Sequence, residues 1–88
     1  MSESRNALIL HLASGGAPLV FALSEASAKS LRTRLPVLMA SAGVDSPELA
    51  DGANVAVNFG HVVSAHLDVA PSDAHVYGQA VRRTGFGG

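Results

Sequence analysis

Residues 54–69 read NVAVNFGHVVSAHLDV, two apolar runs that meet at the letters NFGH. Large and small or polar residues alternate within each run, and alternation at a period of two is typical of strands with one buried face. The polar, glycine-containing break between the runs indicates a hairpin. We therefore expect strands at 54–57 and 62–69, with His61 at a strand end and His66 on a strand face.

A second pair of strands precedes this stretch. Residues 7–13 and 19–23 alternate in the same way. Gly15, Gly16 and Pro18 lie between them and supply the backbone conformations that a hairpin loop needs. The N-terminal quarter of the chain is therefore predicted to form a β-hairpin.

One helix is predicted between the two pairs of strands, over residues 25–42. Ser24 is a suitable N-cap, and apolar residues then recur at three- and four-residue spacing. Pro36 falls on the polar side of this pattern, so we expect either a helix bent near 32–36 or two short helices. Gly43 is the expected left-handed cap.

The order of elements predicts an α+β fold, β-β-α-β-β, in which a four-stranded, mostly antiparallel sheet carries the helix on one face. Residues 1–70 form this domain, and 71–88 form an extended C-terminal tail with a short edge strand around 75–77. The first sheet face, under the helix, is expected to hold Leu8, Leu10, Leu12, Leu19, Phe21, Leu23, Val55, Val57, Val63, Ala65 and Leu67. The second face is expected to hold Ile9, His11, Val20, Ala22, Ala56, Val62, Ser64 and His66.

The composition predicts self-association. The chain has 88 residues, of which 48% are hydrophobic and 15% charged, against about 25% charged in an average globular protein. A chain this short buries only roughly 60–65% of its unfolded surface. We therefore expect a homo-oligomer, a dimer or larger, that pairs through the second sheet face or a sheet edge. The expected interface residues are Ile9, His11, Val20, Val62 and His66.

Charge and hydropathy argue against several kinds of partner and indicate a location. The formal net charge is −1, which disfavours nucleic-acid binding through phosphate neutralisation. No apolar run approaches the ~18 residues of a membrane span, and the N-terminus lacks the features of a signal peptide. The chain has no cysteine, which excludes thiolate metal sites and disulfides. The sequence thus predicts a cytoplasmic protein that binds neither membranes nor nucleic acid.

Candidate chemistry is limited to the histidines. His11, His66 and Asp68 fall on one predicted sheet face, where imidazole and carboxylate groups suit zinc, but no metal-spacing motif supports them. Gly15-Gly16 is a turn and not a phosphate-binding loop, and no serine lies in a G-x-S-x-G elbow. We therefore expect no catalytic, cofactor-binding or metal-binding residues. The predicted function is a small non-enzymatic interaction or regulatory module that binds itself and presents a surface to another protein.

The C-terminus suggests an alternative. The chain ends Thr84-Gly85-Phe86-Gly87-Gly88, and a terminal Gly-Gly after a β-β-α-β-β pattern resembles ubiquitin-like and sulfur-carrier proteins of the β-grasp type. The resemblance implies that Gly87 and Gly88 carry the C-terminal carboxylate into an activating enzyme, as in a sulfur carrier or protein modifier. Arg82-Arg83-Thr84 departs from the apolar stretch that normally leads into such tails.

A second resemblance covers most of the chain. The segments at 19–39, 50–52, 55–63 and 75–78 are similar to short actinobacterial proteins of unknown function. That resemblance implies no activity and assigns no residue a role. It indicates that the Gly-Gly ending is incidental.

Overall fold

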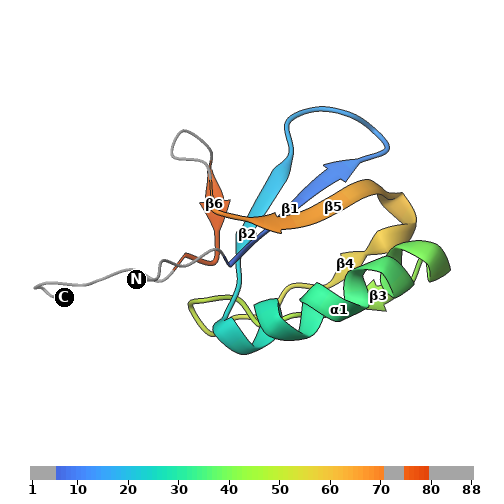
Figure 1. The fold of residues 1–88 in the computed structure, drawn as a ribbon. Coiled ribbons are helices and arrows are strands. Elements are labelled where there is room, and N and C mark those ends of the chain that lie inside the picture. The colour runs from blue at the N-terminus through green and yellow to red at the C-terminus, as the bar shows by residue number, and fades with distance from the viewer. Residues whose placement is uncertain (1–5, 71–74, 80–88) are drawn as a thin grey trace, which may run out of the picture.

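A four-stranded sheet with a helix on one face organises the chain (Figure 1). The computed structural model describes residues 6–70 and 75–79. The strands of the sheet are β1 (Ala7–Leu12), β2 (Leu19–Ala22), β5 (Val62–Asp68) and β6 (Val76–Tyr77), in the order β5-β1-β2-β6. β1 is antiparallel to β2 and β5, whereas β6 is parallel to β2. The predicted α+β class and mostly antiparallel sheet are therefore confirmed.

The helix α1 spans Glu25–Ser41 without interruption, so the alternative of two short helices is wrong. The Ser24 hydroxyl accepts a hydrogen bond from the Ser27 N–H at 3.2 Å, as expected of an N-cap. Pro36 is exposed, which confirms its place on the polar side. The left-handed residue at the C-terminus is Ala42, with φ 55°, and not Gly43.

The expected strand at 54–57 and its hairpin to 62–69 are wrong. Instead, β3 (Val44–Asp45) and β4 (Val57–Asn58) form a separate two-stranded antiparallel sheet. The 3₁₀ turn η1 (Phe59–His61) then leads the chain across to β5. The Asn58 side chain accepts a hydrogen bond from the Gly60 N–H at 2.9 Å and stabilises this change of direction. The fourth strand of the main sheet is β6.

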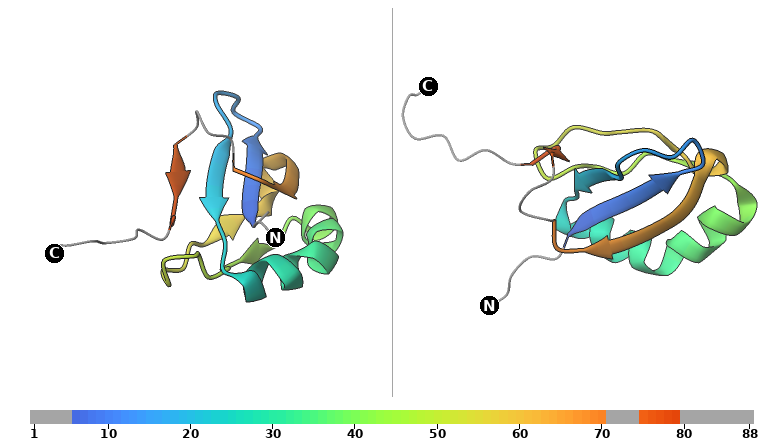
Figure 2. Two further views of the ribbon diagram at one scale, coloured as in Figure 1. Left: turned by 60° about the vertical axis from the view of Figure 1, so that its left-hand side comes forward. Right: turned by 90° about the horizontal axis from the view of Figure 1, so that it is seen from above.

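The first sheet face packs beneath α1 and the 55–59 segment. Figure 2 shows α1 and the short β3–β4 sheet on the same side of the main sheet. Leu8, Leu10 and Leu31 are almost completely inaccessible to solvent. The remaining buried residues of this core are Phe21, Leu23, Ala28, Leu49, Val57, Phe59 and Val62, and Leu12, Leu19, Val55, Ala65 and Leu67 pack against them.

One expected core residue, Val63, lies outside this cluster because β5 contains an irregularity. The register passes from His11 opposite Ser64 to Leu12 opposite Val62, so Val63 is an extra residue in the strand. Such a bulge reverses the inside–outside alternation beyond it. Val63 is consequently 63% exposed, and Val62 is buried in its place.

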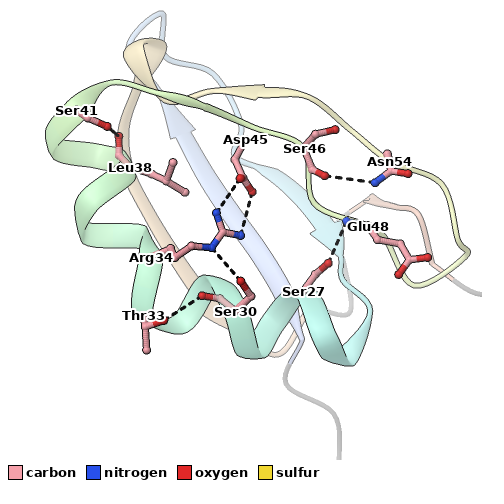
Figure 3. Close-up of polar contacts among 10 residues, drawn as sticks. All are labelled: Ser27, Ser30, Thr33, Arg34, Leu38, Ser41, Asp45, Ser46, Glu48 and Asn54. Carbon is pink, nitrogen blue, oxygen red and sulfur yellow. Dashed lines mark hydrogen bonds and ion pairs between the residues drawn. The ribbon is translucent and has the colours of Figure 1, made fainter.

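Polar contacts fix the inner side of α1 to the segment that follows it (Figure 3). The Arg34 guanidinium binds both carboxylate oxygens of Asp45, at 2.7 and 3.3 Å, and also donates to the Ser30 hydroxyl at 2.9 Å. The hydrogen bond to Asp45 raises the pKa of Arg34. Nearby, the Ser27 hydroxyl accepts from the Glu48 N–H at 3.0 Å. These contacts hold β3 and residues 46–48 over the helix.

Candidate functional site

Much of the second sheet face is covered within the chain. Ile9 is 6% exposed and Val20 is 0% exposed, although both were expected to form an interface between copies. Together with Ala7 they form a second small cluster, against which Ala70 and Val76 pack. Neither side chain is therefore free to contact a second copy unless this cover moves.

Val62 is a correction to the predicted face. It belongs to the core under α1, is 8% exposed, and does not lie on the second face. The reason is the extra residue Val63, which shifts the alternation by one position. Of the five residues expected at an interface, only His11 and His66 are exposed.

His11 and His66 lie on the same sheet face, as predicted, and close to each other. Ile9 lies opposite His66 and His11 opposite Ser64, so the two histidines are diagonal neighbours on adjacent strands. Their ring centroids are 6.2 Å apart and their planes differ by 15°. His61 lies in η1, and the His75 ring contacts Tyr77 with centroids 4.4 Å apart. Among residues 6–70 and 75–79, no group of three potential metal ligands is present.

The outer side of β5 is the second exposed feature, and we call it the free edge. It runs over seven residues, and nothing in the described part of the chain pairs with it. The opposite side of the sheet differs, because β6 pairs with β2 at Val20 and Phe21. We call that side the covered edge.

Two residues of β5 direct their backbone groups outward at the free edge. One hydrogen bond shows which residues of β1 bond toward β2: the Leu23 N–H donates to the Asn6 carbonyl at 2.7 Å. Hydrogen bonding alternates along antiparallel strands, so the even-numbered residues of β1 bond toward β2 and the odd-numbered ones toward β5. The β5 partners of the odd-numbered residues are Asp68, His66 and Ser64. The intervening Ala65 and Leu67 therefore direct their N–H and C=O groups outward.

The side chains of the free edge lack the usual protection against pairing. Natural edge strands often carry lysine or proline, and β5 contains neither. Its only carboxylate is Asp68, at the end of the strand. Val63 and Val69, near its two ends, are both exposed. Within residues 6–70 and 75–79, the bulge at Val63 is the one protective device, and it affects only the start of the strand.

Two surface depressions lined by described residues are open to solvent. One, of about 570 Å³, lies beside the start of α1 and is lined by Asn6, Ser24, Glu25 and Gln79 among others. A smaller apolar hollow of about 200 Å³ lies between the first sheet face and the turn at His61. Neither lining places a histidine beside a serine or a carboxylate.

Comparisons with known proteins add no assignment. No protein family, curated protein or solved structure matches the chain. Within the described ranges, α1 is neither long nor apolar enough to cross a bilayer. Gly87 and Gly88, on which the alternative function depends, lie outside the described residues.

Proposed function

We propose that this protein is a non-enzymatic interaction module in which two copies pair through their free edges. The observation that carries the proposal is the seven-residue strand β5, whose outward backbone groups have no partner within the described residues. Unpaired N–H and C=O groups in a row form a template for another strand. Pairing would join two four-stranded sheets into one.

A second copy is the partner that best suits this edge. A strand can pair antiparallel with its own copy around a two-fold axis, and each copy then offers and receives the same groups. A register centred on His66 would join Ala65 of one copy to Leu67 of the other. The same register brings the exposed Val63 beside the exposed Val69 of the second copy and removes both from water.

Charge also permits this arrangement. The only carboxylate within β5, Asp68, lies at the end of the strand. In antiparallel pairing centred on His66, the two copies of Asp68 lie at opposite ends of the joint and do not repel closely. Since no lysine or arginine is present in β5, the side chains that meet at the centre of the joint are the two copies of His66.

The proposal is tested first by removing one outward N–H. Ala65→Pro eliminates a donor that makes no bond to β1, and proline is tolerated on edge strands in that position. At protein concentrations of tens of micromolar, analytical ultracentrifugation is expected to give the wild type twice the mass of the 8.9 kDa chain. Ala65→Pro is expected to sediment as a monomer with an unchanged circular dichroism spectrum.

A surface substitution covers the case in which Ala65→Pro does not fold. Val63→Lys places a positive charge beside the free edge of both copies and should weaken dimerisation about tenfold. Val37→Lys, on the exposed side of α1, is the matched control, because Val37 is 66% and Val63 63% exposed. A wild type that remains monomeric at high concentration, or equal weakening by both substitutions, would contradict the proposal.

The register can be tested directly because the natural chain contains no cysteine. His66→Cys places two thiols opposite each other across the axis, at a separation from which a disulfide can form. Ser64→Cys is two positions from the axis on each strand and should not crosslink under the same mild oxidation. Rapid crosslinking of Ser64→Cys but not of His66→Cys would show a different register.

A further inference from the structure

The histidine pair is a chemical feature of the single chain, and His66 also lies at the axis of the proposed dimer. His11 comes from β1 and His66 from β5, and both side chains are exposed on the part of the second face that Ala70 and Val76 leave open. Their positions are fixed by the paired backbone of two adjacent strands. Two neutral imidazoles held close together are a chelating donor set.

The two rings lie near each other but not yet in the position of a chelate. Zinc–nitrogen bonds are about 2.0–2.1 Å, and the centre of an imidazole ring lies roughly 1 Å behind its nitrogen, so two imidazoles on one tetrahedral zinc have centroids about 5 Å apart. The observed separation of the His11 and His66 centroids is 6.2 Å, and the ring planes differ by 15°. Closing the chelate therefore requires the two exposed side chains to rotate, so that the rings approach by about 1 Å and turn one nitrogen each toward a common point.

We propose that His11 and His66 of one chain bind a divalent transition-metal ion of the zinc, nickel or copper class. Water fills the remaining coordination positions, because the described residues offer no third protein ligand there. Asp68 follows on β5, but its Oδ1 accepts a hydrogen bond from the Val69 N–H at 2.7 Å. No lysine or arginine lies in β1 or β5 to repel the cation.

The other two histidines serve as internal controls. His61 lies in η1 and His75 contacts Tyr77 near the covered edge, so neither belongs to the pair. The chelate needs only His11 and His66 of one chain, so it can form without the proposed dimer. Titration of both the wild type and the Ala65→Pro variant separates the two proposals, since the monomeric variant should still bind the ion through these two histidines.

Isothermal titration calorimetry with Zn²⁺ and the tag-free chain tests the site. The wild type is expected to bind one Zn²⁺ per chain in the micromolar range. His11→Gln and His66→Gln should each weaken binding about 100-fold, because removal of either imidazole abolishes the chelate. His61→Gln and His75→Gln should leave the affinity unchanged.

Three outcomes would overturn the proposal. The wild type could fail to bind Zn²⁺ up to millimolar concentration, which would leave the histidines as a simple ring–ring contact. His11→Gln could retain the affinity of the wild type. Finally, His61→Gln or His75→Gln could weaken binding as much as His66→Gln, which would indicate scattered surface binding.

Discussion

The two sides of the sheet end in different ways. At the covered edge, β2 pairs with β6, a strand of only two residues after which the chain turns at Gly78. At the free edge, β5 continues for seven residues and ends the sheet among the described residues. Figure 2 shows β5 and β6 on opposite sides of the β1–β2 hairpin. A very short edge strand is a poor template for pairing, whereas a long one is a good template.

The covered edge is closed by a specific contact at Gly78. Its φ is +79°, and a Cβ atom there would lie 2.5 Å from the Leu49 Cδ1 atom and 2.6 Å from the Leu49 Cβ atom. The Gly78 carbonyl accepts a hydrogen bond from the Asp51 N–H at 2.9 Å. Only glycine fits both the backbone angle and the close approach. Gly78 therefore helps to hold β6 in place, together with the pairing of β6 with β2 at Val20 and Phe21.

The largest effect is expected from opening the covered edge with Gly78→Ala. The left-handed backbone costs about 1–2 kcal/mol in alanine, and the overlap with Leu49 adds about 1–3 kcal/mol. We expect the free energy of unfolding to fall by about 2–5 kcal/mol in urea titrations. Release of β6 would also expose β2, so the variant should form oligomers larger than the dimer.

Gly52→Ala is the matched control for this prediction. Gly52 also has a positive φ, +93°, but a Cβ atom there would meet nothing within 4 Å. Its substitution should cost only the backbone penalty of about 1–2 kcal/mol and leave the oligomeric mass unchanged. Equal losses for the two variants would mean that the contact with Leu49 does not hold β6 in place.

A smaller effect is expected at the free edge, in the exchange of backbone amides. If Ala65 and Leu67 bond across a dimer axis, their exchange should slow about ninefold when the dimeric fraction rises from roughly one tenth to nine tenths. Ser64 and His66 donate toward β1 and should show no such dependence. Exchange measured by NMR at several protein concentrations checks this. Concentration-independent exchange at Ala65 would count against pairing through this edge.

The fold class could be predicted because the apolar period is two over β1, β2 and β5 and about 3.6 over α1. The same signal could not distinguish a strand of the main sheet from β4. Val55 and Val57 alternate and pack against or within the core, yet the backbone of β4 pairs with β3. Alternation reports which side chains are buried and does not report the partner of the backbone.

The site was only partly accessible to sequence analysis for a similar reason. His11 and His66 could be placed on one face because β1 and β5 keep a regular alternation over Ala7–His11 and Ser64–Asp68. Val62 could not be placed on the correct face, because the order of apolar residues does not indicate a bulge at Val63. The cover over Ile9 and Val20 comes from Ala70 and Val76, which are distant in sequence from β1 and β2. The absence of lysine and proline from residues 62–68 was the available signal for the free edge.

The smallest effect is expected at Ala42, which calibrates the backbone penalty used for Gly78 and Gly52. Ala42 has φ 55° at the C-terminus of α1 and belongs to neither sheet. Ala42→Gly removes the left-handed strain and should raise the free energy of unfolding by about 1 kcal/mol. Ala40→Gly, at an exposed position inside α1, should instead lower it by about 0.5–1 kcal/mol. Urea unfolding of both variants gives the sign of each change. If Ala42→Gly destabilises the protein as Ala40→Gly does, left-handed strain is not significant here. The loss in Gly78→Ala would then have to arise from the contact with Leu49 alone.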